Sequence, residues 1–117
     1  MYKKSKPTIF EKIFRQIEIA YDYSKGLDFL KVIPVEDLKL DSKTVSKGSP
    51  SGNKYLNELL KTIKINENDS ILDIGSAKGS AIKTMSEFPF RRIDGLEISS
   101  KLVEISIKNF KKLKNNN

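Results

Sequence analysis

The 117-residue sequence contains no cysteine, no histidine and no tryptophan. Without Cys and His, the chain cannot form disulfides, the usual Cys/His zinc site, a thiol or imidazole nucleophile, or a histidine general base. No apolar run approaches the roughly 20 residues of a membrane-spanning helix, and the N-terminal lysines precede charged residues rather than an apolar leader. The length supports one domain at most, so we expect a soluble, cytoplasmic protein with no membrane partner.

Positive charge is concentrated at the two ends of the chain. The 22 Lys and Arg exceed the 15 Asp and Glu, which gives a net charge of +7. Residues 1–15 and residues 101–117 each contain five basic side chains and one glutamate, whereas the segment between them is nearly neutral. Only three residues are arginine, which binds phosphate and guanine bidentately. The composition therefore favours a solvated lysine surface and argues against nucleic acid as a partner.

The N-terminal part of the sequence predicts two amphipathic helices joined by irregular chain. Residues 8–11 have the form of a capping box and precede apolar residues at helical spacing. Leu27–Leu40 is interrupted by Pro34, and both an extended piece and a helical turn fit it. Residues 41–53 form a polar loop, and Ser51 or Asn53 would cap the second helix. We expect the aromatic residues beside these and the following helix to be core: Phe10, Phe14, Tyr21, Tyr55 and Phe88.

From residue 70 onward the pattern changes to strand, helix, strand, helix. An apolar run, Ser70–Ile74, ends at Gly75, and a helix then extends to the stop at Pro89. The second strand spans Arg92–Ile98, and Ser99 or Ser100 caps a last helix with lysines on its solvent face, before a frayed tail of three asparagines. Two strands separated by one helix must be parallel. We therefore predict an α/β fold with a βαβα unit.

Four residues at the ends of the predicted strands point to ligand chemistry. Gly75 leaves the first strand at a sharp bend, where a positive φ is useful. Gly79 begins the helix, where the lack of a side chain would let a ligand approach the backbone N–H groups. Asp73 faces the crevice in which open α/β sheets bind ligands, and Glu97 at the end of the second strand would accept hydrogen bonds from ribose hydroxyls.

Two nucleotide cofactors share this arrangement, and the glycine pattern separates them. A dinucleotide site uses G-x-G-x-x-G, whereas this chain has Gly75, Ala77 and Ser80 at the three positions. An anionic pyrophosphate would also lie next to Asp73. The amino group and positive sulfur of S-adenosylmethionine would instead be attracted by that carboxylate. The residues favour S-adenosylmethionine.

The segments Ile71–Gly79, Phe88–Ser99 and Leu102–Leu113 resemble the first two cofactor motifs of class I S-adenosylmethionine-dependent methyltransferases. The resemblance covers residues 53–113 and extends less closely over residues 21–52. It implies that Glu97 binds the ribose hydroxyls, that Ile98 packs against the adenine, and that Ser51 and Tyr55 lie near a lid over the cofactor. The methionine end would be held by Asp73, Gly75, Ser76, Ala77, Lys78 and Gly79. Ala77 departs from the glycine of the family pattern.

These observations predict a partial Rossmann-like methyltransferase fold. Residues 1–52 would form an N-terminal helix with a lid-like loop, and residues 53–117 an incomplete half-domain that binds S-adenosylmethionine. A complete domain of this class has a larger sheet, so we expect an amino-terminal portion of the enzyme, with the catalytic residues and the methyl acceptor unassigned. Two alternatives remain open: a non-catalytic interaction module that pairs with a partner chain through an open sheet edge, and a small basic nucleic-acid-binding domain.

Overall fold

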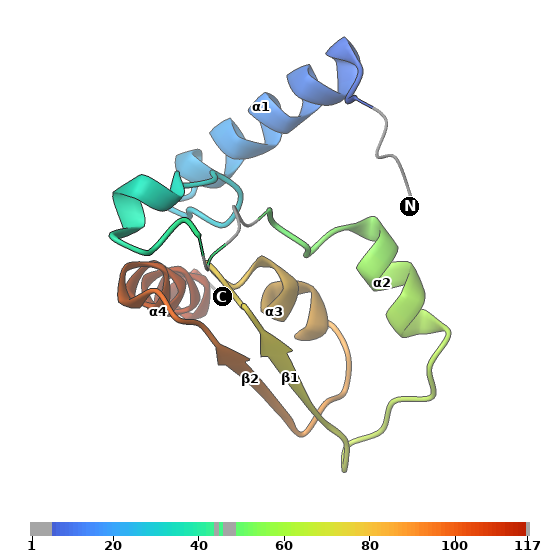
Figure 1. The fold of residues 1–117 in the computed structure, drawn as a ribbon. Coiled ribbons are helices and arrows are strands. Elements are labelled where there is room, and N and C mark those ends of the chain that lie inside the picture. The colour runs from blue at the N-terminus through green and yellow to red at the C-terminus, as the bar shows by residue number, and fades with distance from the viewer. Residues whose placement is uncertain (1–5, 44, 46–48, 117) are drawn as a thin grey trace.

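The computed structural model describes residues 6–43, 45 and 49–116, and these residues form a mixed α/β fold (Figure 1). The predicted loop at residues 41–53 therefore lies partly outside the described residues, as do the lysines at positions 3 and 4 and the last asparagine. The elements in chain order are α1 (Ile9–Ser24), a 3-10 helix η1 (Val35–Leu38), α2 (Lys54–Lys61), β1 (Ser70–Ile74), α3 (Ser80–Met85), β2 (Arg92–Leu96) and α4 (Ser100–Asn115).

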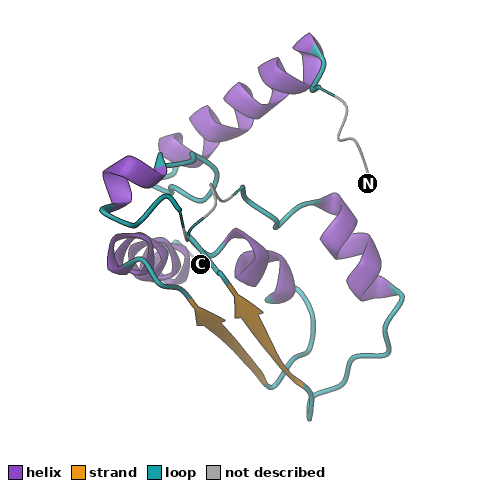
Figure 2. Cartoon of the chain, viewed as in Figure 1, coloured by secondary structure: helices purple, strands orange, loops and turns teal. Residues whose placement is uncertain are grey.

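Within the described residues, β1 and β2 form a two-stranded parallel sheet (Figure 2). Ser70 lies opposite Arg92 and Ile74 opposite Leu96. The predicted parallel pairing is confirmed. Since both strands run in the same direction, their carboxyl ends lie side by side at one edge of the sheet, where the chain enters α3 and α4.

One face of this sheet carries the core. Leu60 of α2 and Ala81 and Met85 of α3 are buried together, and Ile71 and Ile93 of the sheet pack against them. Side chains alternate between the two faces of a strand, so the neighbouring residues point the other way. Leu72, Ile74 and Leu96 are accordingly 54%, 76% and 59% exposed. Parallel sheets are usually covered on both faces, whereas the described residues leave the second face of this sheet bare.

The amphipathic helix α1 begins as predicted but does not contribute its apolar stripe to the core. Thr8 and Glu11 form both bonds of the capping box, with Thr8 N–H donating to Glu11 Oε2 over 2.6 Å. Figure 1 shows α1 extending away from the sheet, and its one buried residue is Asp22 near the C-terminus. The prediction of aromatic core residues is confirmed for Phe88, which packs against the core. It was wrong for four residues that are exposed: Phe10, Phe14, Tyr21 and Tyr55.

The structure settles the conformation of the segment after Gly26 and shortens the second predicted strand. The segment after Gly26 contains the 3-10 turn η1, which follows Pro34. β2 ends at Leu96 rather than Ile98, since the Glu97 carboxylate accepts the Ser99 N–H over 2.9 Å and Ser99 caps α4.

One helix end matches its prediction and two helix ends differ from theirs. α3 ends at Met85, well before Pro89. α2 is capped by Asn53, which is one of the two residues that the sequence predicts as its cap. Asn115 is helical rather than frayed. In the part of the chain that the structure describes, no helix has both the length and the apolar character needed to cross a membrane.

Candidate functional site

The turn between β1 and α3 has the left-handed backbone that its glycines predict. Gly75 has φ +78° and Gly79 φ +89°. The N–H groups of Gly75 and Ser76 both donate to the Leu96 carbonyl, over 2.8 and 3.0 Å, which ties the turn to the end of β2. A Cβ at Gly75 would meet open space, so this position requires glycine for its conformation alone.

Gly79 is required for a different reason from the one that the sequence indicated. A Cβ at Gly79 would lie 2.6 Å from Cε2 of Phe110 and 2.7 Å from Oγ of Ser106, both on α4. Gly79 is buried, and its N–H donates to the Ser76 carbonyl over 2.8 Å. The glycine therefore lets α4 approach the turn. The approach of a ligand to this backbone stays a prediction.

Ala77 adopts a conformation that favours glycine. Its φ is +46°, which places an L-residue in the left-handed region. That conformation costs an alanine roughly 1–2 kcal/mol. The Ala77 N–H donates to Oε2 of Glu97 over 2.8 Å, so the strained residue is held by the acid at the end of β2.

Glu97 joins the turn to the start of α4. Its Oε2 accepts the Ala77 N–H and its Oε1 the Ser99 N–H, over 2.8 and 2.9 Å. A carboxylate has about four acceptor positions, so both oxygens retain the capacity to accept a further hydroxyl. The side chain is half-buried and therefore reachable by a ligand.

Asp73 has a buried carboxylate oxygen without a protein partner. Among the described residues, Oδ2 of Asp73 is the buried side-chain atom that has no hydrogen bond. Burial, and then the charge of Glu97, raise the pKa of Asp73 above its ordinary value of 3.8. Buried polar atoms in folded proteins are normally satisfied. A cationic or hydrogen-donating ligand beside β1 would supply what this oxygen lacks.

A cavity of about 230 Å³ lies at the carboxyl ends of β1 and β2. Five of the predicted cofactor residues line it: Gly75, Ala77, Lys78, Glu97 and Ile98. The other three, Asp73, Ser76 and Gly79, do not line it. The cavity is smaller than the roughly 300–1,000 Å³ of sites for drug-sized ligands, and this size fits one part of a larger ligand.

Most of the apolar lining comes from a segment whose structure the sequence left open. We call residues 29–40 the lead-in wall. It contributes Phe29, Val32, Ile33, Val35, Leu38 and Leu40 to the cavity. Its many apolar residues outside any predicted helix were a signal that this segment covers something apolar. Neither Ser51 nor Tyr55, the residues that the resemblance placed near a lid, lines the cavity.

Lys78 lines the cavity, but its ammonium group is engaged elsewhere. Lys78 Nζ lies 2.7 Å from Oδ1 of Asp28, and the lysine is only 4% exposed. The charge is therefore paired within the protein rather than presented to a ligand.

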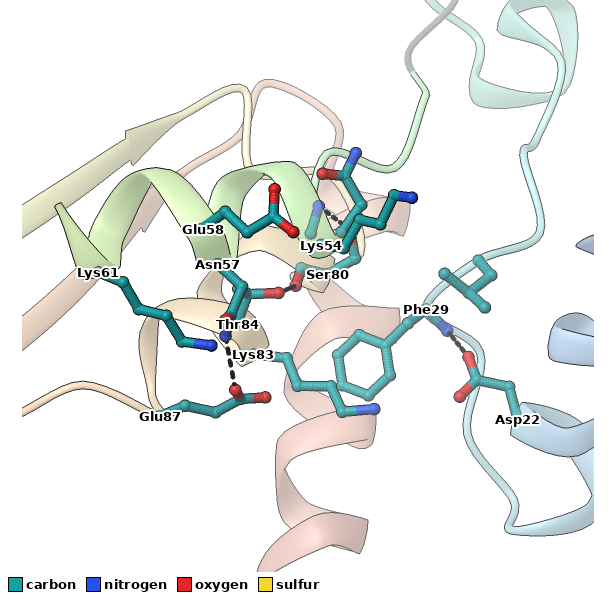
Figure 3. Close-up of a pocket in the computed structure, with 13 residues that line it drawn as sticks. Asp22, Phe29, Lys54, Asn57, Glu58, Lys61, Ser80, Lys83, Thr84 and Glu87 are labelled. Carbon is teal, nitrogen blue, oxygen red and sulfur yellow. Dashed lines mark hydrogen bonds between the residues drawn. The ribbon is translucent and has the colours of Figure 1, made fainter.

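A second, larger cavity of about 450 Å³ lies against α2 and α3 (Figure 3). Its charged side chains are of both signs: Lys54, Lys61 and Lys83 with Asp22, Glu58 and Glu87. Asn57 Nδ2 donates to Glu87 Oε2 over 2.9 Å, and Lys83 Nζ lies 5.0 Å from the centre of the Phe29 ring. None of the predicted cofactor residues lines this cavity, but Phe29 and Ser80 line both cavities, so the two are neighbours. Among the described residues, no group of three or more Asp and Glu is placed to hold a metal ion.

No protein-family model matches the chain, and no curated protein matches it either.

Proposed function

We propose that this chain binds S-adenosylmethionine at the carboxyl ends of β1 and β2, as the cofactor-binding portion of a class I methyltransferase. The observation that carries the proposal is one cavity lined together by the Gly75–Ala77 turn, Glu97 and Ile98. The turn lies 20 or more positions before Glu97 and Ile98 in the sequence, and the parallel pairing of the strands brings the two segments together. Ligands in open α/β folds bind in this crevice.

The chemistry of the site fits the parts of this cofactor. The carboxylate of Glu97 would accept the ribose hydroxyls, and Ile98 with the lead-in wall would pack against the adenine. The unpartnered Oδ2 of Asp73 would attract the positively charged methionine end. When bound, the cofactor supplies an electrophilic methyl group on a sulfonium. A dinucleotide fits less well, because its pyrophosphate would lie near two carboxylates, Asp73 and Glu97.

Titration calorimetry with S-adenosylmethionine tests the proposal. We expect weak binding by the wild type, since Ala77 places a methyl group at the turn, and loss of measurable binding in Glu97→Ala. Because Glu97 also accepts two backbone N–H groups, Glu97→Gln provides a milder second variant. Glu104→Ala, on the exposed surface of α4, is the matched control and should bind like the wild type.

Two results would contradict the proposal. One is tighter binding of a nicotinamide dinucleotide than of S-adenosylmethionine. The other is the absence of a cofactor response together with tight, steeply salt-dependent binding of nucleic acid, which would favour the basic-domain alternative.

The bare sheet face supports a second candidate function, interaction with a partner chain. Leu72, Ile74 and Leu96 form an exposed apolar surface, and among the residues that the structure describes β1 pairs with β2 alone. A partner that adds a strand beside β1 and covers this face would satisfy the free backbone groups of that strand. The two functions are compatible, because the cofactor site lies at the strand ends and the bare face lies along the strands.

A further inference from the structure

The buried ion pair between Lys78 and Asp28 connects the turn after β1 with the chain before the lead-in wall. Nζ of Lys78 and Oδ1 of Asp28 are 2.7 Å apart, with the lysine almost fully buried and the aspartate 27% exposed. The two residues are 50 positions apart in the sequence. A buried lysine is rare unless it is paired, so this contact fixes both segments relative to each other.

Asn109 of α4 joins the same two segments through their backbones. Its Oδ1 accepts the Asp28 N–H over 2.8 Å, and its Nδ2 donates to the carbonyls of Asp28 and Lys78 over 3.0 and 3.2 Å. Asn109 is buried, and these bonds satisfy both polar atoms of its side chain. Three segments distant in sequence therefore meet at one amide group.

The lead-in wall begins at the next residue. Phe29 is buried, and its N–H donates to Oδ2 of Asp22 over 2.9 Å. Its ring packs edge-on against Phe110, with the ring centres 5.6 Å apart. The hydrogen-bonded segment at Asp28 thus leads directly into the residues that form the apolar side of the cavity.

We propose that Lys78, Asp28 and Asn109 are positioning residues: the ion pair and the amide hold the lead-in wall in place and thereby set the affinity for the nucleoside part of the ligand. The identity of that ligand rests on the function proposed above. The position of the wall does not, because the contacts form without a ligand. Lys78 acts through Asp28 and the wall rather than by contact of its ammonium with the cofactor.

Removal of the lysine charge should free the wall. In Lys78→Met the Asp28 carboxylate loses its partner, and the wall then samples other placements. If the correct placement is populated about a tenth of the time, the apparent affinity falls about tenfold.

Amide hydrogen exchange of the ligand-free protein tests the positioning directly. We expect Lys78→Met to speed exchange at Asp28, Phe29 and the following wall residues, with little change in β2. Arg92→Met is the matched control, because it breaks an ion pair of the same 2.7 Å length, Arg92–Asp94, which is exposed and remote from the wall. Unchanged exchange at residues 28–38 in Lys78→Met would overturn the proposal.

Binding of two ligands then separates positioning from general destabilisation. We expect Lys78→Met to weaken S-adenosylmethionine and the shorter 5′-methylthioadenosine by the same factor, about tenfold, since the wall faces the nucleoside that both contain. Met85→Ala opens the core away from the cavity, so it should lower the unfolding temperature and leave the affinity of the folded protein unchanged. An equal loss of affinity in Met85→Ala would contradict a specific role for Lys78.

Two further outcomes are decisive. Should Lys78→Met fail to fold, the double variant Lys78→Met/Asp28→Asn leaves no unpaired buried charge and is expected to fold with the same faster exchange; slow exchange in it would overturn the proposal. Should the wild type bind neither ligand, the proposed cofactor function is contradicted, and the exchange experiment still decides whether Lys78 positions the wall.

Discussion

At the scale of single residues, the end of β1 and the turn after it combine one unusual backbone conformation with one unpartnered carboxylate oxygen. Ala77 has a left-handed backbone, and Asp73 has a buried oxygen without a partner. Both features destabilise the isolated turn, and such local costs are typical of ligand sites. Ala77→Gly and Asp73→Asn should both stabilise the free protein. Their effects on the affinity for S-adenosylmethionine should be opposite, with tighter binding in the first variant and weaker binding in the second.

Ala77→Gly should increase stability. Glycine adopts φ near +46° without the roughly 1–2 kcal/mol cost of alanine, and the greater entropy of the unfolded glycine chain offsets about 0.4–1 kcal/mol of that gain. We expect a net gain of up to about 1 kcal/mol in urea unfolding and tighter binding of S-adenosylmethionine. Ala81→Gly, in α3, is the control and should lose about 1 kcal/mol of helix propensity and roughly a further 0.8 kcal/mol from its buried methyl group. Equal losses in both variants would contradict the strain at Ala77.

Asp73→Asn should stabilise the free protein in a pH-dependent way. Burial and Glu97 raise the pKa of Asp73 above 3.8, so the folded state binds the proton more tightly than the unfolded state. Stability consequently falls as pH rises from about 4 through the raised pKa, and the full penalty is present above it. Urea unfolding should show the asparagine variant to be more stable than the wild type at pH 7, with the difference disappearing below about pH 4.

The same variant should weaken S-adenosylmethionine and leave 5′-methylthioadenosine unaffected, because Asp73 is assigned to the methionine end. A stability difference that is independent of pH would show that the charge of Asp73 is not its cause. Glu104→Gln, an exposed carboxylate change on α4, should leave the pH dependence as it is in the wild type.

At the scale of elements, the close approach of α4 to the turn after β1 determines the site. Phe110 and Ser106 occupy the space in which a side chain at position 79 would lie. The same helix carries Asn109, whose side chain forms hydrogen bonds with the backbone of Asp28 and of Lys78. α4 is therefore the element against which the turn and the lead-in wall are both aligned.

Substitutions at the two glycines of the turn should separate conformation from packing. Gly75→Ala meets open space and should cost roughly 1–2 kcal/mol, from its φ of +78° alone. Gly79→Ala has a similar φ and in addition contacts Phe110 at 2.6 Å, which should add roughly 1–3 kcal/mol of overpacking. Unfolding midpoints of the two variants measure the difference. Equal losses of stability in the two variants would show that α4 moves away from position 79 at no cost in free energy.

At the scale of the whole molecule, the part of the chain that the structure describes leaves a large apolar surface without cover. It includes the bare face of the sheet and the stripe along α1, where Phe10 is 72% exposed. Exposed apolar surface of this extent and an unpaired strand edge are features of proteins that associate. The single-sided core also implies that the sheet contributes less stability than a sheet covered on both faces.

The bare sheet face predicts self-association that increases with concentration. Ile74→Lys places a charge on that face, at the carboxyl end of β1, and should lower the average mass in sedimentation experiments. Ile107→Lys, a comparable change at an exposed position on α4, is the control and should have little effect. A wild-type protein that stays monomeric at high concentration would contradict an interaction role for this face.

Local patterns predicted those parts of the fold that depend on neighbours in sequence. The Thr8 cap, the Asn53 cap and the run Ser70–Ile74 are encoded by residues within a few positions of each other, and the structure confirms them. The aromatic residues of α1 were predicted to be core because their spacing shows an apolar stripe. Spacing shows that a stripe exists and does not show whether another element covers it.

The sequence by itself determined the βαβα order, the parallel strands and the acids at their ends, because one-helix connections and glycine turns follow local rules. Only the tertiary structure decided that Gly79 accommodates α4, that Lys78 pairs with Asp28, and that residues 29–40 form the apolar side of the cavity. These contacts join residues about 30 to 80 positions apart. The packing of distant side chains depends on where α4 and the lead-in wall come to lie, and no local pattern contains that information.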